Sequence, residues 1–426
     1  MGIIKNFDNL NKTPERKICL DLIEAALSSI QPQNIIRKNF SLIENALTIQ
    51  DKVIDLKKFE RVFLLGFGKG SAGLSKEIES MLGNLLTKGY VIDLEPEQFL
   101  KIEFTLGTHP LPSENNLSFT KKAIERLGNL TEKDLIIVVI AGGGSALFEN
   151  PYKINLEKLI EVNKSLLLSG TTITQMNIVR KHLSMVKGGG LIKPLYPALI
   201  VSVIASDVPG NDLSVIASGP TVKDETTKEQ AIQVLRKYNL FDKLNLSSDD
   251  FLETPKNDVY FANTTNILML SNQTALNAME EKARDLGWTC EIFSDRLQTQ
   301  AKTAGKELID KISSAQILLA AGETTVKVLN SNGRGGRNQE LVLATLPHID
   351  ENTTIVSFDS DGWDNTEFAG AIGDSLTIQK AKDMNINPES FLQENNSFSF
   401  FEKTGDGIIT GRLPSNVSDL MIVVKS

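Results

Sequence analysis

Cysteine and histidine are scarce in this chain, which contains two Cys and three His among 426 residues. Cys19 and Cys290 lie far apart in the sequence and form no CxxC pair. The sequence therefore offers no dense cluster of soft ligands for zinc or iron. Any bound metal is expected to be a hard, oxygen-ligated ion such as Mg²⁺.

Long hydrophobic runs and an excess of basic residues are also absent. No stretch reaches the ~18 uninterrupted apolar residues that a membrane span needs, and the N-terminus lacks an apolar leader segment. The formal net charge is -8, whereas nucleic-acid binding needs clustered basic side chains. We expect a cytoplasmic protein with a small-molecule substrate and no nucleic-acid or membrane partner. The sequence is also compatible with a homodimer.

The length of the chain favours two domains, because 426 residues exceed what one hydrophobic core usually supports. A composition of 41% hydrophobic and 23% charged residues is typical of globular proteins. The polar stretch 246–258 is the expected boundary. It gives a larger N-terminal domain, residues 1–257, and a smaller C-terminal domain, residues 258–426.

Short apolar runs rich in Val and Ile alternate with amphipathic stretches of helix length. Such runs are typical of buried strands in a parallel sheet that has helices on both faces and ligand-binding loops at the carboxyl ends of its strands. We therefore expect an α/β fold, Rossmann-like in the N-terminal domain. Thr13-Pro14-Glu15 further predicts a helix that ends before Pro32. The predicted strands are residues 61–66, 88–93, 134–140, 198–205, 315–321 and 353–358.

The first glycine-rich turn, residues 66–73, follows a predicted strand and precedes a helix-like segment. Its bare backbone N–H groups, with Gly68 and Gly70 on either side of Lys69, suit a phosphate or a carboxylate. The spacing also matches a dinucleotide fingerprint, with Asp93 where a ribose-binding acid would lie. A tight turn without a ligand is the third interpretation.

The second glycine-rich turn contains Gly142, Gly143 and Gly144, again directly after a predicted strand. Three glycines cost backbone entropy, which favours close approach of a ligand over a simple packing turn. Ser145 could cap the next helix or bind an anion. No His or Lys stands beside Ser145 in sequence, so the pattern does not indicate a nucleophile.

Two further candidate motifs, with three candidate residues, lie between residues 180 and 207. Arg180, close to a run of glycines, could belong to an anion pocket or to a solvated helix face. Ser206 and Asp207 close a predicted strand. A carboxylate at that position suits a general base or an Mg²⁺ ligand, although an Asx turn explains the same pattern.

The C-terminal half carries the densest polar motif. Glu323 follows a predicted strand, and Arg337, Asn338 and Glu340 follow a glycine-rich turn. An arginine fork beside free N–H groups suits phosphate or carboxylate. Asp361, in an Asp-Gly turn, is a candidate Mg²⁺ ligand or an ordinary turn residue.

Together the motifs resemble those of the glycerate 2-kinases whose C-terminal portion is called the MOFRL domain. The resemblance covers nearly the whole chain and implies ATP-dependent, Mg²⁺-dependent phosphorylation of the 2-hydroxyl of glycerate, in a cleft between two α/β domains. It implies that Lys69 and Arg337 steady the phosphates and that Asp207 activates the acceptor hydroxyl, with Glu323, Asn338 and Glu340 around them. The motifs are GKGSAG, HPLP, AGGGSALF, RKHLSMVKGGG, SDVPGNDLSVIASGPT, AGETTVKV and GRGGRNQELVLA.

Two segments, residues 357–371 and 410–420, depart from the family pattern, and HPLPSE stands where the family usually has HPxPDE. Trp363 and Arg412 replace small or uncharged residues in the two segments, which suggests a changed choice of acceptor. The main alternative function is an NAD(P)H-dependent hydroxypyruvate reductase, supported by the fingerprint at Gly68 to Gly73 with Asp93. A non-catalytic sugar-acid binding protein is the other alternative, and it leaves Asp207 without a task.

Overall fold

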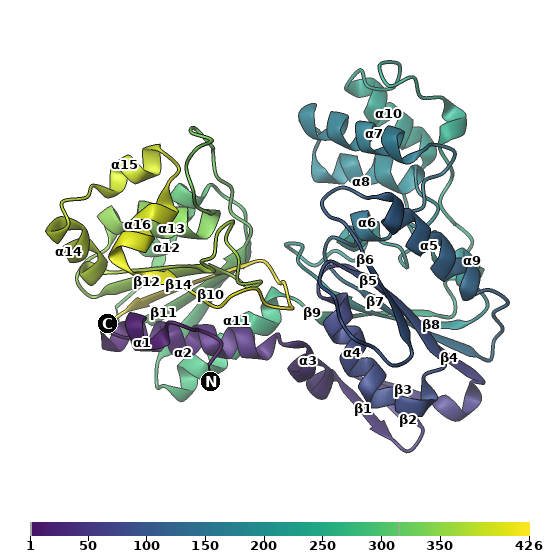
Figure 1. Ribbon diagram of the computed structural model, residues 1–426, viewed down its shortest axis with the longest axis horizontal. Helices are drawn as coiled ribbons and strands as arrows, with labels where there is room; N and C mark the ends of the chain where they lie inside the picture. Colours follow the sequence, from purple (N-terminus) through teal and green to yellow (C-terminus); the bar gives the residue numbers. More distant parts are fainter. Residues whose placement is uncertain (1, 315) are drawn as a thin grey trace. The chain divides into compact units, whose positions relative to one another are not determined.

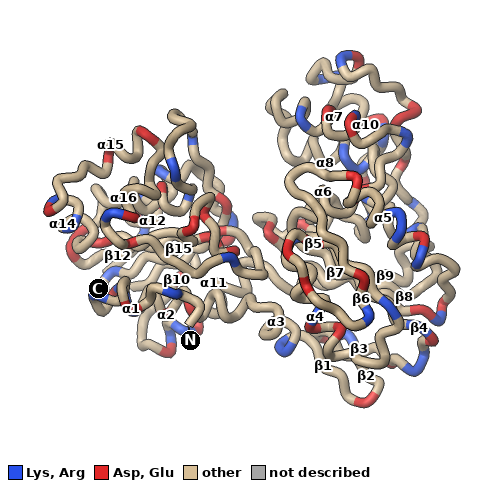
Figure 2. The backbone as a smooth tube through the Cα atoms, in the orientation of Figure 1, with Lys and Arg blue, Asp and Glu red and all other residues tan. Residues whose placement is uncertain are grey.

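The computed structural model describes residues 2–314 and 316–426, which divide into two compact units (Figure 1). The central unit is Ile35–Met269, and the terminal unit combines Met1–Asn34 with Leu270–Ser426. Lys and Arg are interspersed with Asp and Glu along both units (Figure 2). Among the described residues, no helix combines the length and hydrophobicity that crossing a membrane requires.

The central unit is built on a six-stranded sheet of order β6-β5-β4-β7-β8-β9. The neighbouring strands from β6 to β8 pair in parallel. The four predicted strands of this half are confirmed, and their unbroken apolar runs are explained by burial on both faces. The strands are β4 (Arg61–Phe67), β5 (Lys88–Asp93), β6 (Ile102–Leu106), β7 (Asp134–Ile140), β8 (Leu199–Ala205) and β9 (Thr264–Leu270).

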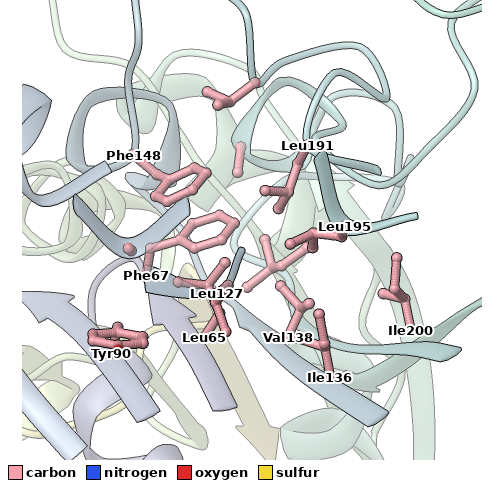
Figure 3. Packing of buried hydrophobic residues seen from close by; sticks show 14 of the residues in the cluster. Leu65, Phe67, Tyr90, Leu127, Ile136, Val138, Phe148, Leu191, Leu195 and Ile200 are labelled. Atoms are coloured by element: carbon pink, nitrogen blue, oxygen red, sulfur yellow. The ribbon is translucent and has the colours of Figure 1, made fainter. Parts of the chain in front are cut away.

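Phe67, the last residue of β4, stacks on Phe148 with ring centroids 4.2 Å apart. Side chains of β4, β7 and β8 pack around this pair and against Leu191 and Leu195 (Figure 3). The core therefore extends beneath the loops that leave the carboxyl ends of the strands. The helices of the unit are α3 (Pro32–Asn39), α4 (Ser71–Leu82), α5 (Glu114–Arg126), α6 (Gly144–Leu147), α7 (Leu156–Leu168), α8 (Ile173–His182), α9 (Ile192–Leu195) and α10 (Lys228–Lys237).

Two smaller assemblies complete the central unit. An antiparallel sheet consists of β1 (Phe40–Ile43), β2 (Ala46–Ile49) and β3 (Lys52–Asp55). Helices α7, α8 and α10 bury a second apolar cluster that includes Val162, Met176 and Leu235. This helical cluster fixes the position of α8, which carries Arg180.

The terminal unit contains a mixed sheet of order β10-β11-β15-β12-β13-β14. The predicted strands near 316 and 353 are present, with Ala315 outside the described residues. They are not neighbours in a parallel sheet, because β15 lies between them and runs antiparallel to both. An unbroken apolar run shows burial on two faces but not strand direction. The strands are β10 (Thr289–Leu297), β11 (Gln316–Gly322), β12 (Thr353–Asp359), β13 (Gly370–Gly373), β14 (Gly407–Ile408) and β15 (Asp419–Lys425).

The N-terminal helix α2 (Pro14–Ser29) belongs to the terminal unit. As predicted, Thr13 caps it, with the side chain accepting a hydrogen bond from the backbone of Arg16. The fully buried Arg16 guanidinium then pairs with Asp374 at 2.6 Å and Asp406 at 2.7 Å. This division differs from the expected boundary between residues 257 and 258, because those ion pairs join partners more than 350 positions apart in sequence. The remaining helices are α1 (Phe7–Leu10), α11 (Asn272–Asp285), α12 (Ala301–Lys311), α13 (Arg337–Thr345), α14 (Ser375–Asp383), α15 (Pro388–Gln393) and α16 (Ser397–Thr404).

Candidate functional site

The two predicted glycine turns lie side by side at the carboxyl edge of the central sheet. The backbone N–H of Lys69 donates to the carbonyl of Gly142 over 2.8 Å, which ties the first turn to the second. Gly68 has φ +110°, and a Cβ there would lie 2.3 Å from the carbonyl oxygen of Ala141. Glycine is therefore required at position 68 by both conformation and space. The half-buried Lys69 side chain is held at the junction of the two turns.

Asp207 reaches the same place from the end of β8. A Cβ on Gly142 would lie 1.9 Å from Asp207 Oδ2. The carboxylate therefore rests against the bare backbone of the second glycine turn. The neighbouring Ser206 is buried, and its hydroxyl accepts a hydrogen bond from the backbone N–H of Val208 at 3.2 Å. Ser206 thus shapes the turn that presents Asp207.

His109 is a member of this site that residue-by-residue sequence reasoning missed. A Cβ on Gly143 would lie 3.2 Å from His109 Nε2 and 3.4 Å from Lys69 Cγ, so all three residues are close together. Burial and the Lys69 charge lower the pKa of His109 to about 4. The imidazole is therefore neutral at pH 7. The HPLP motif was the available signal, but a lone His in a sequence does not indicate what surrounds it.

The Ser145 side chain begins a short chain of hydrogen bonds. Its hydroxyl lies 2.9 Å from that of Ser218, which donates to Asn177 Oδ1 at 3.2 Å. Neither contact supplies a base that would activate the Ser145 hydroxyl. The close packing of this turn explains Gly144, where a Cβ would lie 2.8 Å from Ala217.

Asp93, the acid on which the dinucleotide interpretation depends, is almost fully buried. Its carboxylate accepts hydrogen bonds from the backbone N–H groups of Ala72 and Leu94, at 2.9 and 2.6 Å. Burial raises its pKa to about 6, against the effect of these bonds. Asp93 is thus committed to holding the start of α4, which explains its position after β5 without a ribose.

Arg337 and three carboxylates form the main polar cluster of the terminal unit. The guanidinium pairs with Asp419 at 2.6 Å, Glu323 at 2.7 Å and Asp359 at 3.4 Å. Strand register brings two of these acids together, since Asp359 of β12 faces Asp419 of β15. Burial raises the pKa of both acids, to about 7 for Asp419, although Arg337 acts in the opposite direction.

The other predicted residues of this unit separate into two groups. Asn338 donates to Asp419 Oδ1 at 2.8 Å and accepts from Ser357 at 2.5 Å, so it supports the Arg337 cluster. Glu340 instead accepts from Asn395 at 3.1 Å, and burial raises its pKa. The structure thus brings Asn338, but not Glu340, into hydrogen-bonding contact with the acids around Arg337.

Asp361 lies in the turn after β12, where its carboxylate accepts from the backbone of Trp363 at 2.9 Å. Across residues 2–314 and 316–426, no group of three or more His, Cys, Asp or Glu side chains is arranged to hold a metal ion. The two departures from the family pattern meet next to this turn, since the Arg412 guanidinium lies 4.2 Å from the centre of the Trp363 ring. This cation–π contact explains why the half-buried Trp363 is accompanied by Arg.

Comparisons with known proteins find relatives that match nearly the whole chain. Residues 18–253 match the family described as domain of unknown function DUF4147, and residues 316–419 match the MOFRL family. A glycerate 2-kinase of Pyrococcus horikoshii is 34% identical, over 96% of this chain and 97% of that protein. The crystal structure of a glycerate kinase from Thermotoga maritima superimposes with a TM-score of 0.86 at 30% identity, over 96% of this chain and 99% of that one. A protein of Agrobacterium vitis named putative hydroxypyruvate reductase is 31% identical, over 97% of this chain and 95% of that protein.

Fold and site together define an α/β protein. One unit carries two glycine turns, the first of which contains Lys69, and the other unit carries an arginine–carboxylate cluster. Both family matches and the full-length relatives agree with that description. The chain belongs to the glycerate 2-kinase family, with a MOFRL-type C-terminal portion.

Proposed function

We propose that this chain is a kinase that uses ATP to phosphorylate the 2-hydroxyl of glycerate, forming 2-phosphoglycerate. The observation that carries the proposal is the junction of the two glycine turns, where Lys69 and Asp207 are held against the same backbone segment, Gly142–Gly143. A cation beside a carboxylate suits transfer of a phosphoryl group to a hydroxyl. Full-length relatives that are named glycerate 2-kinases support this substrate.

The chemistry divides among three residues. Asp207 takes the proton of the 2-hydroxyl while that oxygen forms its bond to the γ-phosphorus of ATP and the bond from phosphorus to the β,γ-bridging oxygen breaks. Lys69 neutralises negative charge on the transferring phosphoryl group. Arg337 binds nucleotide phosphate through its planar donor fork.

Mg²⁺ suits this donor set as a partner of the nucleotide. Mg²⁺ in kinases is usually held by substrate phosphates and only one or two carboxylates, so the described residues need not form a closed protein cage. Asp361 is the carboxylate that we propose for it. The ion would supply charge neutralisation at the phosphates.

The reductase alternative is supported by the names of two relatives and by the glycine spacing of the first turn. It requires an acid that binds the ribose at the end of β5. Because both oxygens of Asp93 already accept backbone hydrogen bonds, the kinase is the better-supported proposal. The position of the Asp207 carboxylate against Gly142, in the same turn that Lys69 contacts, likewise favours catalysis over a non-catalytic sugar-acid binding protein.

Purified protein should form ADP from ATP only when D-glycerate and Mg²⁺ are both present. Coupled detection of ADP measures turnover, and ³¹P NMR of the product distinguishes the 2-phosphate from the 3-phosphate. A parallel reaction with hydroxypyruvate and NADH serves as the control. Oxidation of NADH without formation of ADP would favour the reductase instead.

Replacing Gly142 by Ala should lower kcat by about 10²-fold, because the new Cβ displaces the Asp207 carboxylate and misplaced catalytic groups lose about that much. The far end of a side chain can move, so we expect the protein to stay folded. In the Asp207→Asn background the same change should cost little more, since the displaced group is already inactive. Full additivity of the two losses would contradict this contact as the cause.

A further inference from the structure

A cavity of about 310 Å³ opens beside the second glycine turn, entirely within the central unit. Its polar lining comes from His109, from Ser145 and Glu149 around α6, and from Asn163, Arg180 and Lys187. The segment 110–112, Pro-Leu-Pro, supplies an apolar wall. The volume is at the lower end of the ~300–1,000 Å³ range of ligand sites, so a molecule of few atoms fits it better than a nucleotide.

Two of the charges in the cavity neutralise each other. Glu149 and Lys187 are both almost fully buried and form an ion pair. The other oxygen of Glu149 accepts from Ser184 Oγ at 2.5 Å and from the backbone N–H of Asn150 at 2.9 Å. Glu149 is therefore committed to these partners.

Arg180 is the third charged residue of the cavity lining and takes no part in the ion pair between Glu149 and Lys187. Its Nε donates to the neutral Asn163 Oδ1 at 2.8 Å, and within the described part of the chain no carboxylate forms an ion pair with it. Burial lowers the pKa of Arg180, while the charge of nearby Glu149 acts in the opposite direction, and a guanidinium stays protonated at neutral pH. Arg180 is half-buried and Glu149 is already paired with Lys187, so a cation that forms no ion pair of its own favours an anion in this site. Asn163 fixes the group by Nε, which leaves the paired terminal nitrogens suited to a planar carboxylate.

Another part of the cavity lining is uncharged and adjoins the proposed reaction centre. His109 and Ser145 line the cavity, and His109 lies next to Lys69 across Gly143. The pKa of His109 is held at about 4, so the imidazole offers hydrogen bonds without adding charge. A small hydroxy acid that places its carboxylate on Arg180 would point its hydroxyl end toward these neutral groups.

We propose that this cavity is the acceptor site, and that Arg180 recognises the carboxylate of a three-carbon 2-hydroxy acid. This inference rests on the proposed kinase function. It also assigns carboxylate recognition to Arg180 and not to Arg412, the residue to which the departures in sequence draw attention.

The test compares D-glycerate with its neutral amide, glyceramide, as acceptors and as ligands. The wild-type enzyme should prefer glycerate by about 10- to 100-fold in kcat/KM, the range expected for one charge-assisted pair. In Arg180→Gln that preference should vanish, with KM for glycerate raised and KM for ATP nearly unchanged. Arg180→Lys should restore part of the preference. The exposed Arg284→Gln is the matched control and should behave as wild type.

Calorimetric titration of D-glycerate without nucleotide separates this inference from the kinase proposal. Tight binding that Arg180→Gln abolishes would support the acceptor site even if no ADP forms. An unchanged preference for glycerate over glyceramide in a folded Arg180→Gln enzyme would overturn the inference. So would loss of that preference in Arg412→Gln alone, or a change confined to KM for ATP.

Discussion

Replacing Lys69 by Ala should lower kcat by about 10²- to 10⁴-fold, the range for removing one cation from a transferring phosphoryl group. Lys69 is tied to the second glycine turn through its backbone, by the bond from its N–H to the carbonyl of Gly142. Truncation of the side chain leaves that bond in place. We therefore expect the turn, and the thermal unfolding of the protein, to be nearly unchanged.

The variant also tests the cause of the His109 pKa shift. Part of the lowering comes from the Lys69 charge, so the pKa of His109 should rise in Lys69→Ala. NMR titration of the imidazole measures this directly and does not depend on activity. Lys58→Ala, at an exposed position before β4, is the control and should alter neither kcat nor the titration. Near-normal kcat in Lys69→Ala would remove this residue from the reaction.

Local patterns in the sequence were sufficient to predict much of the central unit. Unbroken apolar runs predicted β4, β5, β7 and β8, because strands buried on both faces need no polar alternation. Glycine turns after β4 and β7 were recognisable because few residues other than Gly tolerate positive φ, as at Gly68 and Gly143. Parallel pairing then places both turns at one edge of the sheet.

The features that could not be predicted depend on contacts between residues far apart in the sequence. Asp419 pairs with Arg337 across 82 positions, and Arg16 pairs with Asp374 across 358. No periodicity links such residues, so the insertion of β15 and the position of α2 in the terminal unit were missed. The sequence indicated Arg180 and Ser145 as candidate anion-binding residues but not that they line one cavity, since Arg180 contributes to it only after α7, α8 and the second glycine turn are packed together.

Replacing Arg337 by Ala should affect both turnover and stability, unlike the Lys69 change. We expect kcat to fall by about 10²- to 10⁴-fold, because a phosphate-binding fork is lost. The free energy of unfolding should also fall, by roughly 2–4 kcal/mol. Removing one partner of a fully buried ion pair costs ~3–5 kcal/mol, and the Arg337 side chain is 27% exposed.

The stability loss should depend on pH in a defined direction. Burial raises the pKa of Asp419 from 3.8 to about 7 and raises that of Asp359, so the folded state binds protons that the unfolded state releases. Stability from these acids therefore decreases as pH rises from about 4 to 7. Without Arg337 both pKa values rise further, and the difference between variant and wild type should be larger at pH 8 than at pH 6.

Urea unfolding of wild type and Arg337→Ala at pH 6 and pH 8 measures this effect. Arg334→Ala is the matched control, because that arginine lies in the loop that leads into α13 and, among the acids of the described residues, pairs only with the exposed Glu367. Surface pairs contribute about 0–1 kcal/mol, so the control should unfold almost as wild type at both pH values. Arg337→Lys should recover part of the stability but little of the turnover, since one ammonium cannot replace a fork shared by three carboxylates. If Arg337→Ala lost the same free energy of unfolding at pH 6 and at pH 8, Arg337 would not be lowering the pKa of these carboxylates.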